Sequence, residues 1–155
     1  MQTTHIKARL VIFDGECRAE TLVLDEPLSF WGGLEPKTGR IIDERHPQQG
    51  ATVTDRILML PGTRGSTSSP GALCESLRLG TGPAGILLPA PNVTILTAVT
   101  VAAELYQCSI PVLVVEQSEL DILSLFKEIQ IILKGTLNGL PCGPASPGSD
   151  QVTSR

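Results

Sequence analysis

Residues 85–115 read GILLPAPNVTILTAVTVAAELYQCSIPVLVV, and this stretch carries the plainest folding pattern in the chain. Residues 85–89 and 111–115 are short, continuous apolar runs of the kind that buried strands show. Between them, Asn92 is a good N-cap for a helix over residues 93–106. A strand, a helix and a second strand make a βαβ unit, so the sequence predicts an α/β fold.

A further strand is predicted upstream, over residues 52–60, and it runs directly into the segment PGTRGSTSSPG, residues 61–71. We call this segment the Gly/Ser loop. Residues 72–79 follow as a predicted helix, which Gly80 and Gly82 close. A strand therefore delivers a polar loop that leads into a helix, an arrangement that often builds a binding site.

The two ends of the chain give weaker patterns. Residues 6–13 and 21–24 have strand-like apolar character and are predicted to pair with each other. Residues 31–50 are rich in turn formers and predict a long, shaped loop with a short strand. Ser118 and Asp121 match a capping box ahead of a predicted amphipathic helix over residues 122–134. We therefore expect one domain over residues 1–134 and a flexible Gly/Pro/Ser-rich tail over residues 135–155.

The composition excludes several classes of protein. Apolar residues make up 41% of the 155 residues, charged residues 18% and aromatic residues 3%, which favours an aliphatic α/β core. The net charge of -4 and the lack of a Lys/Arg block argue against nucleic acid as a partner. No segment is predicted to act as a signal peptide or a membrane span, so we expect a cytoplasmic protein without a membrane partner.

The cysteines are too scattered to suggest a metal site or a redox motif. They contain no C-x-x-C pair and no neighbouring histidine at metal-ligand spacing, so no metal ligands are predicted in this chain. Reduced and mostly buried thiols are favoured over a disulfide framework. The four positions are Cys17, Cys74, Cys108 and Cys142.

The Gly/Ser loop is the first candidate for chemistry. Its three glycines allow backbone N–H groups to converge, Arg64 adds a fixed cation, and several hydroxyl groups add donors. The dipole of a following helix would add to the same field, so the loop suits an oxyanion or a carboxylate. It matches neither a P-loop nor a nucleophile elbow, and a Ser/Gly-rich surface connector is the open alternative.

A second candidate lies in the turn-rich segment. Asp43 and His46 could form an acid–base pair, but a histidine that only stabilises its own turn is the favoured interpretation, so both residues are secondary candidates. Gly32 and Gly33 follow Trp31, which is predicted to be a half-buried anchor in preference to a residue that packs over this loop or meets a partner. No pair of carboxylates has a spacing that suggests general acid–base catalysis.

Four stretches in order carry a family resemblance: WGGLEPKTGRIIDERHP (31–47), LPGTRGSTS (60–68), PAPN (89–92) and IPVLV (110–114). Together they resemble the small-subunit domain of aconitase X, over about residues 6–116. The resemblance implies a swivelling β/β/α domain, with a barrel-like mixed sheet flanked by helices. It also implies a large subunit as partner, which holds most of the active site and its metal ion or iron–sulfur cluster.

The same resemblance implies a hydro-lyase that removes water from a small hydroxy acid. The substrate would be cis-3-hydroxy-L-proline or, as in archaeal relatives, 5-phosphomevalonate. Ser66 would be the proton-abstracting base, with its alkoxide stabilised by backbone N–H groups, Arg64 and a metal from the partner. The substrate-binding residues implied or predicted around it are Arg64, Gly65, Thr67, Ser68, Gly32, Gly33, Asp43 and His46.

The resemblance weakens after Glu116. Family members end in further strand-like sequence, whereas residues 120–134 here have a helical pattern and a Gly/Pro/Ser tail follows. A non-catalytic anion-binding or assembly module of the same fold is therefore the alternative from another functional class.

Overall fold

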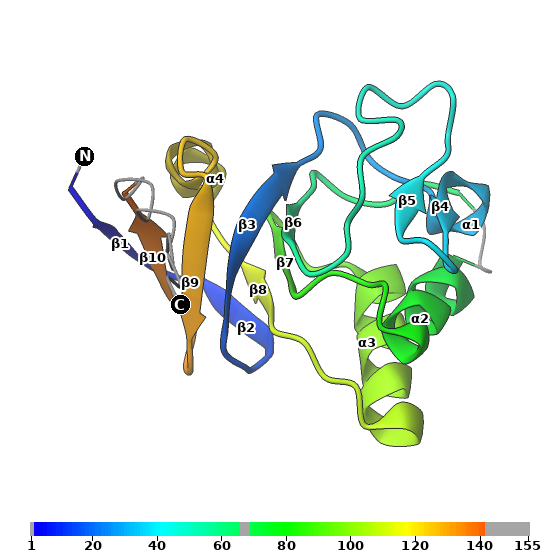
Figure 1. The fold of residues 1–155 in the computed structure, drawn as a ribbon. Coiled ribbons are helices and arrows are strands. Elements are labelled where there is room, and N and C mark those ends of the chain that lie inside the picture. The colour runs from blue at the N-terminus through cyan, green and yellow to red at the C-terminus, as the bar shows by residue number, and fades with distance from the viewer. Residues whose placement is uncertain (1, 66–68, 142–155) are drawn as a thin grey trace, which may run out of the picture.

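The computed structural model describes residues 2–65 and 69–141. Its main feature is an eight-stranded mixed sheet in the order β1-β10-β9-β3-β6-β7-β8-β2, which curls into half a barrel with helices against it (Figure 1). This confirms the predicted barrel-like α/β architecture. The sheet contains β1 (Thr4–Lys7), β2 (Leu10–Phe13), β3 (Cys17–Val23), β6 (Ile57–Met59), β7 (Gly85–Leu88), β8 (Val112–Val114), β9 (Glu128–Ile132) and β10 (Thr136–Leu140).

Helices and a small hairpin surround the sheet. The helices are α1 (Phe30–Gly33), α2 (Ser69–Leu79), α3 (Val93–Tyr106) and α4 (Gln117–Leu123), and the hairpin pairs β4 (Leu34–Glu35) with β5 (Arg40–Ile41). In Figure 1, α2 and α3 lie side by side on one side of the sheet, and α1 and the hairpin lie beyond the upper end of α2. Among the described residues, no helix is long and apolar enough to cross a membrane.

The central strand β3 joins the two halves of the sheet. Residues 17–20 pair antiparallel with β9, whereas residues 21–23 pair parallel with β6. From there β6, β7 and β8 continue in parallel. The carboxyl ends of β3, β6, β7 and β8 therefore meet at one edge of the sheet.

Alternation along the parallel strands produces two cores. Leu58 and Ile86 point to one face, where they pack in a cluster with buried side chains of α2 and α3 such as Leu73. Ile57 and Leu87 point to the other face, inside the half barrel. Successive side chains on a strand face opposite sides of the sheet. Because both sides are covered here, every position on these strands is apolar, which explains the continuous apolar runs in the sequence.

The predicted strand over residues 6–13 is two strands. After β1, Ala8 N–H donates to Gly135 O and Arg9 N–H donates to Val114 O, so the chain crosses from β10 to β8 within two residues. Since β1 and β2 are the two ends of the strand order, this crossing requires the sheet to curl. The predicted pairing of residues 6–13 with residues 21–24 is therefore wrong.

The predicted C-terminal helix and the start of the predicted tail are also wrong. Residues 128–132 form β9 instead of continuing a helix over residues 122–134, and Ile129 and Ile131 are buried. Residues 136–140, expected in the tail, form β10 between β1 and β9, where Leu137 is fully buried. The rest of the predicted tail, residues 142–155, lies outside the described residues.

The βαβ unit is confirmed. Asn92 caps α3, whose bounds are those predicted, and the Asn92 side chain accepts a hydrogen bond from Ile95 N–H at 3.0 Å. The strand predicted over residues 52–60 is shorter, since β6 begins at Ile57, and the helix predicted from residue 72 begins at Ser69. The Gly/Ser loop therefore ends on the first turn of α2.

Gly139 tests the corrected C-terminal end. A Cβ atom on this residue would lie 2.6–2.8 Å from ring atoms of Phe126, so the strand passes directly over that ring. We predict that Gly139→Ala lowers the free energy of unfolding by about 1–3 kcal/mol through overpacking, measured by urea denaturation. Gly71→Ala is the matched control, because a Cβ there meets no atom within 4 Å, and it is expected to be neutral or stabilising. A neutral Gly139→Ala would mean that residues 136–140 belong to a tail after all.

Candidate functional site

Four segments converge where the parallel strands end. They are the residues that directly follow β3, β6, β7 and β8, because carboxyl ends of parallel strands meet at one edge and ligands commonly bind there. The described part of the Gly/Ser loop, residues 61–65, emerges from β6 in the middle of this edge. The predicted loop is therefore at the position where an α/β sheet most often carries its site.

Two neighbours hold the beginning of the Gly/Ser loop. On one side, Leu28 N–H donates to Gly62 O at 3.3 Å and Arg64 N–H donates to Leu28 O at 3.2 Å. On the other side, the Asn92 side-chain amide donates to Thr63 Oγ1 at 3.0 Å. The residue that caps α3 thus also holds the described beginning of the loop, and residues 62–64 are part of the folded scaffold.

Gly65 makes a tight turn at the end of the described part of the loop. Its φ of 99° lies in the region that favours glycine, and a Cβ atom there would lie 2.6 Å from Ser29 Oγ. The loop therefore turns tightly against Ser29 at this point. Ser66, Thr67 and Ser68, three of the predicted site residues, lie outside the described residues.

An open depression of about 750 Å³ adjoins the loop. It brings together three of the predicted site residues, Arg64, Asp43 and Gly32. Arg64 Nη2 lies 3.5 Å from Glu26 Oε2 and 4.0 Å from Asp43 Oδ2, and all three side chains are partly exposed. Ion pairs of this length and exposure are weak, so Arg64 is free to exchange a protein carboxylate for one on a ligand.

His46 does not reach this depression. Its ring is buried, Nδ1 accepts a hydrogen bond from Gln48 N–H at 3.1 Å, and Nε2 donates to Glu26 O at 3.1 Å. Both ring nitrogens are engaged by backbone groups, so the geometry favours the turn-stabilising reading over the acid–base pair with Asp43. His46 instead fixes the backbone beside Glu26.

Gly33 is also removed from the depression. It is buried, and a Cβ atom there would lie 3.3 Å from Leu28 Cδ1 and 3.7 Å from Asp43 Cβ. Its carbonyl accepts from Ile42 N–H at 2.9 Å, which ties the hairpin segment to α1. The role that the geometry gives Gly33 is close packing beneath the site.

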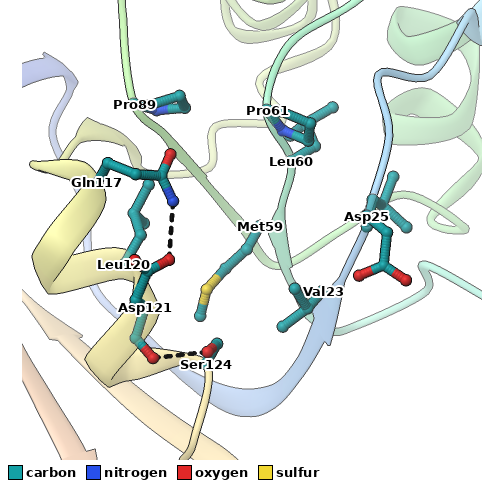
Figure 2. Close-up of a pocket in the computed structure, with 11 residues that line it drawn as sticks. Val23, Asp25, Met59, Leu60, Pro61, Pro89, Gln117, Leu120, Asp121 and Ser124 are labelled. Atoms are coloured by element: carbon teal, nitrogen blue, oxygen red, sulfur yellow. Dashed lines mark hydrogen bonds between the residues drawn. The ribbon is translucent and has the colours of Figure 1, made fainter.

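A second cavity of about 350 Å³ lies at the same edge and was not predicted (Figure 2). Its polar side chains are already paired: Gln48 Nε2 donates to Asp25 Oδ2 at 2.7 Å, and Gln117 Nε2 donates to Asp121 Oδ1 at 2.9 Å. The two cavities are neighbours, because Asp25 lines this one and Glu26 lines the depression. The sequence analysis missed Asp25 and Glu26, although they are the first two residues after the strand predicted over residues 21–24.

The three cysteines in the described part of the chain do not line the depression. Burial raises the pKa of the Cys17 thiol to about 11, and burial followed by the nearby charge of Glu75 raises the pKa of Cys74. These and Cys108 are free thiols, but only Cys74 is buried and the other two are half-buried, which differs from the prediction of mostly buried thiols; Cys142 lies outside the described residues. Among the described residues, no group of three or more His, Cys, Asp or Glu side chains is placed to hold a metal ion.

Comparison with known proteins identifies the family. The model of the aconitase X swivel domain matches residues 5–137. The chain belongs to this family. The match continues through β9 into β10, so the predicted departure from the family after Glu116 disappears once these strands are seen.

Two kinds of curated relative match this swivel domain. It is 32% identical over 153 residues to a cis-3-hydroxy-L-proline dehydratase of Hypocrea jecorina, covering 97% of the chain and 25% of that protein. It is 42% identical over 77 residues to a phosphomevalonate dehydratase small subunit of Methanothermobacter thermautotrophicus, covering 50% of the chain and 59% of that protein. The chain thus spans less than two thirds of each relative.

The fold has a counterpart among solved structures. The crystal structure of Thermococcus kodakaraensis aconitase X in its holo-form superposes with a TM-score of 0.75 at 23% identity, covering 89% of this chain and 99% of that one. At this level of identity the likeness concerns the fold, and it supports the half-barrel arrangement with β9 and β10 in place.

Asn92 gives a direct test of how the loop is held. We predict that Asn92→Ala lowers the free energy of unfolding by about 1–2 kcal/mol, because α3 loses its cap and Thr63 loses its partner. Asn92→Asp keeps the cap acceptor and should retain most of the stability, and Thr63→Val should cost less than Asn92→Ala. Urea denaturation measures all three, and equal losses for Asn92→Asp and Asn92→Ala would contradict the capping role.

Proposed function

We propose that this chain is the small, swivelling part of an aconitase X type dehydratase, which removes water from a small hydroxy acid together with a large subunit. One observation carries the proposal. In a chain of this family, the Gly/Ser loop is anchored at the carboxyl edge of the sheet, next to an open depression that contains Arg64 between two carboxylates. A cytoplasmic location belongs to the same proposal.

Ser66 is the proposed base. It would take the proton from the carbon that bears the substrate carboxylate, while the hydroxyl group on the neighbouring carbon leaves with the bonding electrons as hydroxide. The hydroxide would then take up the proton from Ser66, so that one water molecule is lost overall and the base is restored. A serine hydroxyl holds its proton too tightly to do this unaided, so its surroundings must favour the alkoxide. The left-handed turn at Gly65, the Arg64 guanidinium and the nearby first turn of α2 support this role.

The metal ion or iron–sulfur cluster of the family is proposed to belong to the large subunit. That group would supply Lewis-acid chemistry at the departing hydroxyl. This chain would contribute the base and a cation for the substrate carboxylate.

The charges around the depression favour cis-3-hydroxy-L-proline as substrate. Three carboxylates and two guanidinium groups line it, which leaves one net negative charge; they belong to Glu26, Asp43, Glu44, Arg45 and Arg64. Hydroxyproline is a zwitterion, so its carboxylate can pair with Arg64 while its ring ammonium faces Glu26 or Asp43. Phosphomevalonate carries a carboxylate and a phosphate but no cation, and it would meet unfavourable charge here.

Phosphomevalonate dehydration is the second candidate, because the 42% identity to the archaeal small subunit is higher than the identity to the hydroxyproline enzyme. A complex that is inert on both substrates and on a wider panel of hydroxy acids would favour the third reading, a non-catalytic anion-binding module.

Replacement of the proposed base tests the catalytic claim. In the assembled complex, Ser66→Ala is expected to lower kcat by about 10²–10⁴-fold, the usual contribution of a positioned base, while the large subunit still binds. Ser109→Ala, at an exposed serine outside the loop, is the control and should leave kcat unchanged. Unchanged turnover in Ser66→Ala would require the base assignment to be abandoned.

Replacement of Glu26 tests the choice of substrate. Glu26→Gln removes a carboxylate next to Arg64, so kcat/KM is expected to fall for the zwitterionic hydroxyproline relative to phosphomevalonate, by about tenfold in the ratio. Glu16→Gln removes an exposed carboxylate at the opposite end of β3 and serves as the control. A ratio that does not change in Glu26→Gln would contradict recognition of the substrate ammonium by this carboxylate.

A further inference from the structure

The solvent-facing side of α3 carries almost no charge. Exposed positions recur along the helix at helical spacing, and the opposite side is buried in the core through residues such as Ile95 and Val99. Val93 is 79% exposed and Leu105 is 68% exposed. Apart from Tyr106, which lines a neighbouring cleft, the exposed positions form what we call the α3 face: Val93, Leu96, Thr97, Thr100, Val101, Glu104 and Leu105.

A helix that is apolar on all sides is normally covered on all sides. The α3 face consists of four aliphatic side chains, two threonines and a single carboxylate. Such a surface is rarely exposed to water, because exposed helix faces are mostly charged. A cleft of about 290 Å³ between α2 and α3 extends this surface, with Pro70, Cys74, Val101 and Tyr106 among its lining residues. The α3 face therefore has the character of an interface.

This surface is continuous with the site. α3 begins at Val93, directly after Asn92, whose side chain holds Thr63 of the Gly/Ser loop. The cleft begins at Pro70 and Gly71, on the first turn of the helix that follows the same loop. A partner protein that covers the loop and completes the site is therefore expected to contact the start of the α3 face as well.

We propose that the α3 face and the adjoining α2–α3 cleft are the surface on which the large aconitase X subunit docks, an inference that rests on the proposed function. Residues 93–105 extend about 20 Å along the helix axis and the helix is about 10 Å wide, which gives roughly 200 Å². Stable complexes bury about 800 Å² on each partner. Contact with the α3 face alone therefore falls short of this area, so the α3 face fits a partner whose contact extends beyond it onto the cleft and the described part of the loop.

The size of the relatives supports this occupant. Nearly the whole chain matches only a quarter of the Hypocrea jecorina dehydratase, so most of that protein is available to contact a domain like this one. The partner surface is expected to be apolar, with a Lys or Arg side chain opposite Glu104, the one charge on the α3 face.

The test measures binding of this chain to the aconitase X large subunit of the same organism, together with dehydration by the complex. Leu105 is the residue to replace, because it lies at the far end of α3 from the loop and is exposed in the chain alone. Leu105→Glu is expected to weaken binding by at least tenfold without changing the melting temperature of the chain. Leu125→Glu is the matched control, since Leu125 is 72% exposed at the end of α4, outside the α3 face, and it should change binding by less than twofold.

The outcomes separate this inference from the proposed function. A wild-type complex that dehydrates its substrate while Leu105→Glu binds normally would overturn the docking surface and leave the function intact. A wild-type chain that neither binds the large subunit nor supports dehydration would contradict the proposed function itself. A chain that is dimeric alone, and monomeric as Leu105→Glu, would assign the α3 face to a second copy and also overturn the inference.

Discussion

The division of β3 between two partners governs the architecture of this swivel domain. Its first half pairs antiparallel with β9 and its second half pairs parallel with β6, so one strand joins a meander to a parallel βαβ layer. Thr21, at the change of partner, donates from its hydroxyl to Phe126 O, and its carbonyl accepts from Arg56 Nη2. These bonds satisfy backbone groups that the change of partner leaves outside either ladder.

The position of the candidate site follows from the parallel pairing of β3 with β6. Because β3 and β6 run in parallel, the segment after β3 lies beside the segment after β6, and Leu28 can form backbone bonds to both sides of Thr63. Glu26 is thereby placed against Arg64. An arginine held loosely between two carboxylates suits a ligand that carries both charges, and this charge pattern is the basis on which hydroxyproline is proposed as the substrate.

The sequence was most informative where the signals are local. Asn92 defines the start of α3 by its own hydrogen bond, and the apolar runs around it predicted β7 and β8 because both faces of those strands are covered. The sequence was misleading at the C-terminal end. Four apolar residues fall near helical spacing there by coincidence, namely Leu123, Phe126, Ile129 and Leu133, and Gly135 resembles a helix stop. β10 pairs with β9 across a short turn and with β1, more than 100 residues away, and the pairing with β1 is the part that no local pattern reveals.

The candidate site, like the fold, was predictable where its residues are close in sequence and was missed where strand pairing brings them together. The composition of the Gly/Ser loop indicated an anion site, and Arg64, Asp43 and Gly32 do lie together. Glu26 was missed because its position against Arg64 comes from pairing between β3 and β6. For His46 the favoured turn-stabilising role agrees with its two backbone partners, which the sequence does not show.

The central claim is that this chain supplies half of a dehydratase site to a large subunit. The most direct measurement is the rate of dehydration of cis-3-hydroxy-L-proline by the large subunit of the same organism, with and without this chain, and with 5-phosphomevalonate in parallel. The account predicts turnover of hydroxyproline only when both chains are present, at a higher kcat/KM than for phosphomevalonate. Equal turnover by the large subunit alone, or by this chain alone, would contradict it.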